Sequence, residues 1–295
     1  MRIGYACINN SIGCTANSTF RLSNYTEDNL IKKVENNLSC LFKILKWNVE
    51  HKIYFFRISS DLVPFASHPI CKFDWVFYFE KQFREIGDFI KKNNIRISMH
   101  PDQFVLINAK DKKIVQRSFA ELEYHSRVLD ALGLDESAKI QIHVGGVYDD
   151  KELSIKRFVD NFKQLPECVK RRLVIENEER LYSLKDCLRI SSSIGIPVLF
   201  DVFHHSLHNN KENISDSIRL AGETWKDKDG CLMMDYSSQK ENGRFGAHIE
   251  SIYLKDFEKF FKEVKKSKIS IDLILEIKDK EKSVLKAIEF YNSHN

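Results

Sequence analysis

The stretch Ile196-Pro197-Val198-Leu199-Phe200-Asp201-Val202-Phe203-His204-His205 passes from an apolar run directly into an acid and two histidines. Residues 172–177, Arg-Leu-Val-Ile-Glu-Asn, have the same form, and Glu176 ends the run. Short apolar runs rich in β-branched residues are typical of strands buried on both faces, as in a parallel sheet. Ligands bind at the carboxyl ends of such strands, so the two stretches predict both a fold class and the place of a site.

Eight runs of this kind alternate with eight helical patterns along the chain. The predicted strands are residues 3–7, 53–58, 95–99, 139–144, 172–176, 196–201, 231–236 and 271–277. The predicted helices are residues 26–49, 75–92, 114–132, 152–162, 183–194, 214–225, 249–265 and 280–291. Strict alternation predicts a closed (β/α)8 TIM barrel in which residues 1–295 form a single domain. An open doubly wound sheet is the alternative, but no G-x-G-x-x-G follows the first strand.

The composition is that of a globular chain of 295 residues, 43% hydrophobic and 30% charged. The net charge of +4, from 46 Lys and Arg against 42 Asp and Glu, permits nucleic-acid binding without demanding it. No apolar stretch reaches the length of a membrane span and no signal peptide fits the start, so we expect no membrane association. The absence of a heptad repeat favours a monomer without an obligate protein partner.

The seven cysteines are scattered and form no Cys-x-x-Cys pair. An odd and unpatterned count predicts reduced thiols in a cytoplasmic protein. Cys14 lies in a polar loop, whereas Cys40 and the remaining cysteines lie in or beside apolar runs and are expected to be small core residues.

Metal-binding residue types stand at the ends of six predicted strands. They are His100, His143, Glu176, Asp201 with His204, Asp235 and Glu276, and His68 and His248 lie in loops on the same side. Any one of them alone is as well explained by a hydrogen bond or an ion pair, but a barrel brings all strand ends to one face. The donors exceed the needs of one ion, so two or three divalent ions are expected. The oxygen-rich set favours Mn²⁺, with Zn²⁺, Fe²⁺ or Co²⁺ as alternatives.

Clustered divalent ions of this kind suit the hydrolysis of phosphodiesters. The main competitor is the metal-assisted isomerisation or epimerisation of a sugar on the same barrel. The two hypotheses differ in the loop after the third predicted strand, where Gln103 and Phe104 favour recognition of damaged DNA over a small-sugar pocket.

A series of short motifs runs in order through nearly the whole chain. They include Gly4-Tyr5-Ala6-Cys7-Ile8-Asn9, Arg57-Ile58-Ser59-Ser60, Ser67-His68-Pro69, His100-Pro101-Asp102-Gln103-Phe104, His143-Val144-Gly145-Gly146, Val174-Ile175-Glu176-Asn177 and Leu275-Glu276-Ile277-Lys278. Together they resemble the UV damage endonucleases (UVDE), a DNA-repair branch of the metal-dependent barrels that includes endonuclease IV.

The resemblance implies a manganese-dependent endonuclease that nicks the phosphodiester immediately 5′ of a lesion in double-stranded DNA and leaves 3′-OH and 5′-phosphate. Its substrates would be cyclobutane pyrimidine dimers, 6-4 photoproducts and abasic sites. By position, the family's metal ligands correspond to His100, His143, Glu176, Asp201, His204, His248 and Glu276. Tyr5 and Asn9 correspond to contacts with the damaged nucleotides, and Gln103 and Phe104 to the pair that probes the duplex. His68 corresponds to a residue near the metals and the scissile phosphate.

One departure concerns the seventh predicted strand, where many family members have Lys-x-His and the lysine can carry a carbamate. Here Met233 cannot be carbamylated, and Asp235 takes the place of the histidine as a metal ligand through oxygen. At the probing pair, Phe104 keeps the stacking face of the usual tyrosine but lacks its hydroxyl.

Basic residues on the catalytic-face loops, Arg57, Arg244 and Lys278, are expected to bind phosphates. We assign the catalytic roles to Glu176, Glu276, His68 and Lys278. Two further alternatives remain open at this point: an abasic-site endonuclease without dimer recognition, and a catalytically inactive protein that binds DNA damage.

Overall fold

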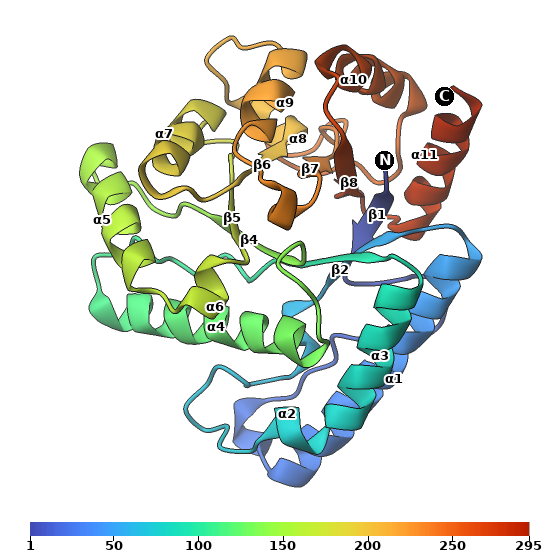
Figure 1. Ribbon diagram of the computed structural model, residues 1–295, viewed down its shortest axis with the longest axis vertical. Helices are drawn as coiled ribbons and strands as arrows, with labels where there is room; N and C mark the ends of the chain where they lie inside the picture. The colour runs from blue at the N-terminus through green and yellow to red at the C-terminus, as the bar shows by residue number, and fades with distance from the viewer. Residues whose placement is uncertain (295) are drawn as a thin grey trace.

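Eight parallel strands close into a barrel in the computed structural model, which describes residues 1–294 (Figure 1). Each strand pairs with the next along the chain, and β1 pairs with β8 to close the ring. The strands are β1 (Ile3–Ala6), β2 (Phe55–Ile58), β3 (Arg96–Met99), β4 (Lys139–His143), β5 (Leu173–Glu176), β6 (Val198–Asp201), β7 (Leu232–Tyr236) and β8 (Ile271–Leu275). The predicted TIM barrel is thereby confirmed.

Helices surround the strands on the outside of the ring (Figure 1). They are α1 (Glu27–Glu50), α2 (Trp75–Tyr78), α3 (Glu80–Lys92), α4 (Lys112–Ala131), α5 (Lys151–Gln164), α6 (Glu167–Lys170), α7 (Leu184–Ile194), α8 (Val202–Leu207), α9 (Ile214–Gly222), α10 (Leu254–Ser267) and α11 (Glu281–Ser293). In α1, Leu30, Val34 and Leu41 are buried at helical spacing, and the Thr26 side chain caps the first turn. The last helix brings the chain ends together, because the Met1 ammonium donates to the Tyr291 hydroxyl at 3.3 Å.

The structure departs from the expected helices in two places that matter for the site. Residues 249–253, predicted as helix, are irregular, and Ile249 pairs with backbone on both sides: its N–H donates to Ser238 and its carbonyl accepts from Lys278. The short helix α8 begins directly after β6, where the Asp201 side chain accepts a hydrogen bond from the His204 N–H at 2.7 Å. This N-cap starts a helix at a position where a polar loop was expected.

The barrel interior contains an apolar layer formed by five inward side chains. They are Phe55, Val174, Leu199, Met233 and Ile274. Side chains of a strand alternate between its two faces, so the residue two positions further along each strand also points inward. Those residues are Arg57, Glu176, Asp201, Asp235 and Glu276, which places them together at the C-terminal end of the ring. Met233 is thus part of the apolar layer.

The N-terminal end of the barrel buries a separate set of charges, and these are paired. The Asp272 carboxylate accepts hydrogen bonds from Arg96 and Arg2 at 2.9 Å each, and Lys139 pairs with Asp229. Close contact between strands also constrains this region: a Cβ on Gly4 would lie 1.9 Å from the Phe55 carbonyl oxygen, so β1 and β2 approach as they do only because residue 4 is glycine.

The prediction that all seven cysteines are reduced thiols is wrong for two of them. Cys14 and Cys40 form a disulfide, with their Cα atoms 6.0 Å apart, that ties the loop after β1 to α1. Counting cysteines cannot detect this pairing, because the two residues are brought together only when the loop folds onto the helix. The thiol argument for a cytoplasmic location is thereby lost. No helix among residues 1–294 combines the length and the apolar character that crossing a bilayer requires.

Candidate metal centre

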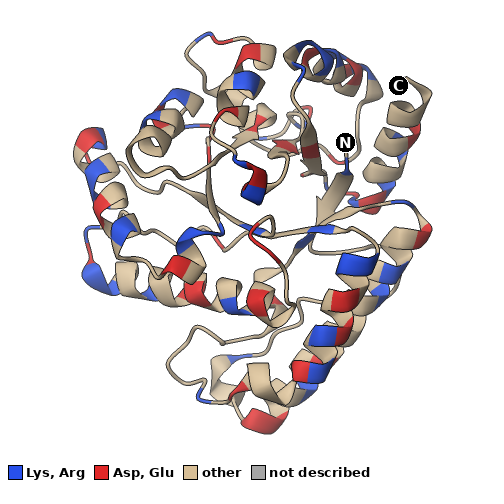
Figure 2. Ribbon diagram, in the orientation of Figure 1, with Lys and Arg blue, Asp and Glu red and all other residues tan. Residues whose placement is uncertain are grey.

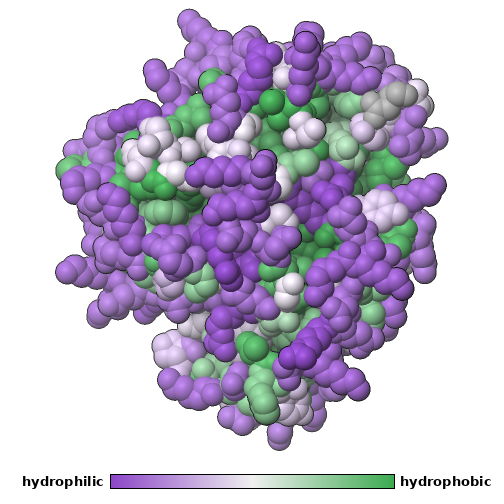
Figure 3. Space-filling model, viewed as in Figure 1, coloured by the Kyte–Doolittle hydropathy of each residue, from purple (hydrophilic) through white to green (hydrophobic). Residues whose placement is uncertain are grey.

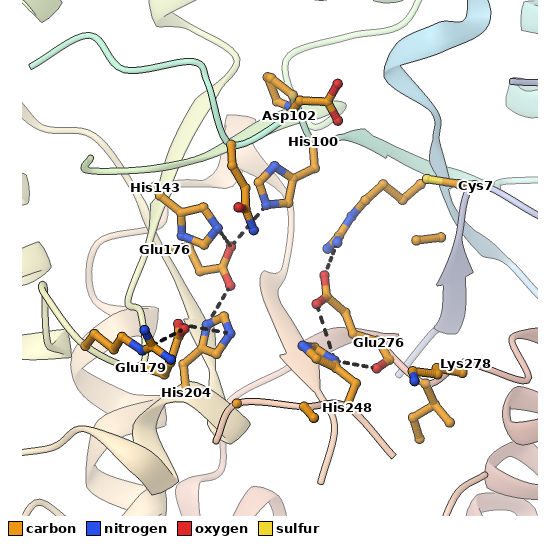
Figure 4. A pocket seen from close by; sticks show the side chains of 18 of the residues that line it. Cys7, His100, Asp102, His143, Glu176, Glu179, His204, His248, Glu276 and Lys278 are labelled. Atoms are coloured by element: carbon orange, nitrogen blue, oxygen red, sulfur yellow. Dashed lines mark hydrogen bonds and ion pairs between the residues drawn. The ribbon is translucent and has the colours of Figure 1, made fainter. Parts of the chain in front are cut away.

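A cavity of about 760 Å³ opens at the C-terminal ends of the strands, over the apolar layer (Figure 4). Its lining comes from the ends of several strands and from the loops that follow them, including His100, His143, Glu176, His204, His248 and Glu276. The prediction that these residues, remote in sequence, meet at one face of the barrel is therefore confirmed for this set. The opposite, N-terminal end of the barrel faces the viewer in Figure 3 and carries mostly hydrophilic residues over its middle.

Glu176 lies at the centre of three imidazoles that point toward it (Figure 4). Its carboxylate is 3.1 Å from His204 Nδ1, 3.6 Å from His100 Nε2 and 4.0 Å from His143 Nε2. Glu176 is almost fully buried. A buried carboxylate among ring nitrogens is stable only with cations or protons between them, so this arrangement has the donor set of a metal site.

Asp201 extends this group on the side of β6. One carboxylate oxygen, Oδ1, caps α8, while Oδ2 is buried and accepts no hydrogen bond from the described residues. Asn177 fixes the segment through two bonds with the Asp201 backbone, at 2.9 and 3.0 Å, and its carbonyl lies 3.1 Å from His204 Nδ1. His204 Nδ1 lies 3.4 Å from Oδ2, so the charge of this oxygen is met by the imidazolium or, in its place, by a metal cation.

Candidate donor atoms within 4.8 Å of one another form three groups: His100 with His143 and Glu176, Glu176 with Asp201 and His204, and Asp201 with Asp235 and Glu276. Glu176 is shared by the first two groups, as a bridging ligand would be. Imidazole nitrogen and carboxylate oxygen without thiolate suit Mn²⁺, Zn²⁺ or Co²⁺. The residues present therefore fit the divalent ions expected from the sequence.

The third group contains a cation of the protein itself. Arg57 was expected on a rim loop, but it lies in β2 and points inward, buried, because Phe55 two residues earlier faces the barrel interior. Its guanidinium donates to both Asp235 oxygens, at 2.6 and 2.8 Å, and to Glu276. Both terminal amino groups of Arg57 are thus engaged with carboxylates at the cavity wall, and its contact with a DNA phosphate stays a prediction.

Two residues at the centre were not singled out from the sequence. Gln141 donates from Nε2 to Glu176 at 2.5 Å and to Asp235 at 2.6 Å. It stands two positions before His143 on β4, so the alternation of the strand could have placed it inward. Glu179 lies 3.8 Å from His204 Nε2 and lines the cavity; it follows the strand in a loop, where no periodic signal indicates direction.

The ionisation of the centre reflects its excess of carboxylates. Although burial favours the neutral acid, His143, His204 and His100 hold the pKa of Glu176 well below its ordinary value. Burial opposes protonation of His204, but Asp201 and Glu176 raise its pKa to about 11. Burial raises the pKa of Asp201 well above its ordinary value; His204 opposes the rise and Glu176 adds to it. A proton held among these groups therefore balances part of the carboxylate charge, and a bound metal ion would take the place of that proton.

The remaining predicted residues of this face divide between the cavity and its surroundings. His248 Nδ1 is 2.7 Å from the Glu276 carbonyl, and Arg244 and Lys278 line the cavity with exposed side chains. Lys278 pairs with Glu250 at 3.0 Å.

The Gln103–Phe104 pair lies between this cavity and a second one of about 780 Å³. Gln103 lines the first cavity, and Phe104, 64% exposed, lines the second; Asp102 lines both. His68 is exposed in the second cavity and does not join the ligand cluster, because residues 61–72 form a loop on the outer side of Asp102. Its catalytic role stays a prediction.

Tyr5 and Asn9 were expected to contact damaged nucleotides, but both side chains are buried. The Tyr5 hydroxyl donates to Asn48 at 2.6 Å and accepts from Asn9 Nδ2 at 2.8 Å, and neither residue lines the cavity. Burial raises the pKa of the Tyr5 hydroxyl well above its ordinary value. This closed network supports the fold beneath the loop after β1 and leaves no face of either residue for DNA.

Comparisons with known proteins agree with these features. The family model described as UV-endonuclease UvdE matches residues 1–294. A UV DNA damage endonuclease from Clostridium perfringens (strain 13 / Type A) is 40% identical over 290 residues, which are 98% of this chain and 70% of that protein. The crystal structure of SacUVDE superposes with a TM-score of 0.95 at 45% identity, covering 99% of this chain and 98% of that one.

More distant structures share the barrel. Endonuclease IV from Thermus thermophilus has a TM-score of 0.59 at 11% identity, over 85% of this chain and 93% of that one. D-Psicose 3-epimerase from Clostridium cellulolyticum has a TM-score of 0.58 at 11% identity, over 86% and 93%. At such identities the likeness concerns the fold alone, so it does not separate nucleases from sugar enzymes.

Proposed function

Since the chain belongs to the UV-endonuclease UvdE family, we propose that it is a divalent-metal-dependent endonuclease that nicks double-stranded DNA immediately 5′ of UV lesions. The lesions are cyclobutane pyrimidine dimers and 6-4 photoproducts, with abasic sites as a further substrate, and the products carry 3′-OH and 5′-phosphate. The observation that carries the proposal is the buried Glu176 carboxylate among His100, His143 and His204 in a chain that matches this family along residues 1–294.

Two or three ions would be held by His100, His143, Glu176, Asp201, His204, Asp235, His248 and Glu276. Mn²⁺ suits this oxygen-rich set best, and Zn²⁺ or Co²⁺ are alternatives. Bound ions of this kind supply a hydroxide-like nucleophile at neutral pH and neutralise charge on the phosphate.

The protein's own residues hold this arrangement in place. Asn177 fixes the Asp201 backbone, and Oδ2 lies 3.4 Å from His204 Nδ1. Arg57 holds Glu276 and Asp235 by charged hydrogen bonds, so both carboxylates are oriented before any substrate arrives. Lys278 and Arg244, on exposed parts of the cavity wall, bind phosphates that flank the scissile bond.

Lesion recognition falls to the loop after β3. A pyrimidine dimer stacks and pairs poorly, so it leaves the duplex at lower cost than normal bases. Phe104 is exposed beside the cavity and fills the vacated stack, while the Gln103 amide bonds the orphaned partner bases. We also propose that the chain is a single domain, that it acts as a monomer and that it is cytoplasmic.

The test uses a duplex with one defined thymine dimer, labelled at the 5′ end of the damaged strand and incubated with Mn²⁺. Undamaged and abasic duplexes of the same sequence serve as controls, together with the Glu176→Gln variant. We expect one cut 5′ of the dimer, a product that a polymerase extends, and no cut by the variant. Cutting of abasic DNA alone would leave an abasic-site endonuclease. Binding without cutting would leave a damage-binding protein, and metal uptake without interest in DNA would favour a sugar enzyme.

A further inference from the structure

The segment 237–248, between β7 and α10, forms a hairpin whose residues 244–248 line the cavity at the C-terminal end of the barrel. Gln239 and His248 pair across it, and the Lys240 N–H donates to the Ala247 carbonyl at 2.7 Å. The Gln239 side chain fastens the tip, because its Nε2 donates to the Arg244 carbonyl at 2.8 Å and its Oε1 accepts from the Gly246 N–H at 3.0 Å. Gly246 has a φ of 77°, a left-handed conformation that favours glycine.

Phe245 stands at this fastened tip, 51% exposed, and lines the metal cavity. The Arg180 guanidinium lies 5.6 Å from the centre of its ring. The ring is therefore held over the metal cavity with part of its surface open to a ligand that has a flat apolar face.

The surroundings of the ring are cationic. Arg180, Arg244, Lys278 and Lys280 line the same cavity, and within residues 1–294 no carboxylate pairs with Arg244. Elsewhere, basic and acidic residues are mixed along the helices that surround the barrel (Figure 2). Aromatic rings set among arginines are the arrangement by which proteins bind unstacked nucleotides: the ring stacks on a base and the arginines contact phosphates.

The topology adds a second observation. The Gln103–Phe104 pair follows β3 and the hairpin follows β7, and these strands are four apart in a closed ring of eight, so they lie on opposite sides of the barrel. The Gln103–Phe104 pair and Phe245 therefore lie on opposite sides of the ring, and Gln103 and Phe245 line the metal cavity.

We propose that the hairpin 237–248 is a second DNA-contacting element, in which Phe245 stacks on a nucleobase unstacked beside the lesion while Arg180 and Arg244 bind the adjacent phosphates. This inference rests on the proposed function, because it takes damaged DNA as the ligand. Phe245 contributes to binding and has no part in the chemistry at the metals.

The test compares Phe245→Ala, Phe245→Leu and Phe245→Trp in the Glu176→Gln background, so that binding is measured without cutting. The ligand is a dimer-containing duplex with 2-aminopurine beside the lesion, read by anisotropy and by quenching of the aminopurine. Phe77→Ala is the matched control, since Phe77 is 77% exposed on α2 and lines neither cavity. We expect Phe245→Ala to weaken binding about 5- to 100-fold and to lose the quenching, with Trp retaining both and Leu neither.

Two further variants sharpen the result. Gln239→Ala keeps the Phe245 side chain but removes the hydrogen bonds that hold the hairpin tip. We expect its loss of affinity to lie between those of the parent chain and Phe245→Ala. Arg244→Ala should lower the dependence of log Kd on log salt by about one unit, as for one lost phosphate contact. Equal affinities of Phe245→Ala and Phe77→Ala, or equal performance of Leu and Trp, would overturn the inference. If the parent chain binds the dimer duplex with this Phe245 dependence yet never cuts it, the proposed endonuclease activity fails while the inference stands.

Discussion

The two ends of the barrel bury charged side chains in opposite ways. At the N-terminal end every buried acid meets a buried base, as Asp272 meets Arg96 and Asp229 meets Lys139. At the C-terminal end four carboxylates lie close together, and the one guanidinium beside them, that of Arg57, pairs with only Asp235 and Glu276. The four are Glu176, Asp201, Asp235 and Glu276.

The comparison shows how one fold separates stability from chemistry. Paired charges at one end satisfy each other and need no ligand. Surplus carboxylates at the other end destabilise the protein unless protons or metal ions join them, so that end is poised for cations. Substitutions at the two ends should therefore be distinguishable by what they change.

The largest expected effect is the loss of activity in Glu176→Gln. The bridging carboxylate becomes a neutral amide, so incision of the dimer duplex should fall about 1,000-fold or more, measured by single-turnover kinetics. Stability of the metal-free protein in urea should fall, because His143, His204 and His100 favour the ionised carboxylate in the folded state. A variant with near-parental rates would remove Glu176 from the centre.

Asp272→Asn tests the opposite end. It leaves Arg96 buried without its anionic partner, so the free energy of unfolding should fall by about 3 to 5 kcal/mol while the folded fraction keeps its activity. Asp88→Asn is the control, because Asp88 pairs with Lys91 on the exposed surface and should cost no more than about 0.5 kcal/mol. A loss of activity without a loss of stability in Asp272→Asn would break the comparison.

Asp201 and Asp235 form a matched pair within the metal end, because they are register partners on β6 and β7. Asp201 Oδ2 has no hydrogen-bond partner among the described residues, whereas both Asp235 oxygens accept from Arg57. We expect Asp201→Asn to lower bound Mn²⁺, measured by mass spectrometry after dialysis, by about one ion per chain. Asp235→Asn should lower it less, and equal losses would show that Asp235 is as much a ligand as Asp201.

The smallest effect concerns pH. In protein freed of metal by a chelator, Asp201 and Glu176 outweigh burial and raise the pKa of His204 to about 11, so the ring holds a proton at neutral pH. A metal ion must displace that proton, so metal affinity should rise with pH, about tenfold per unit between pH 6 and 8. Calorimetry in buffers of different ionisation enthalpy should show about one proton released per chain. No release would indicate that His204 is already neutral.

Much of this contrast was predictable from the sequence, because a strand that ends in His or Asp indicates its place in a parallel barrel. Glu176, Asp201 and Glu276 were found in this way. The direction of Arg57 and Tyr5 was not, since a strand buried on both faces shows no polar alternation to separate the barrel interior from the helix layer. The Cys14–Cys40 disulfide and the Phe245 tip depend on how loops fold, and loop sequences carry no periodicity that reveals it.

The contact between Met1 and Tyr291 has a consequence for connectivity. Because β1 and β8 are hydrogen-bonded neighbours, linking the end of α11 to the start of β1 asks for little new chain, and the ring has no intrinsic first strand. A circularly permuted gene opened at the exposed turn around Lys211 would supply the same ligands in a different order. The metal centre belongs to the closed ring rather than to any one order of its segments along the chain.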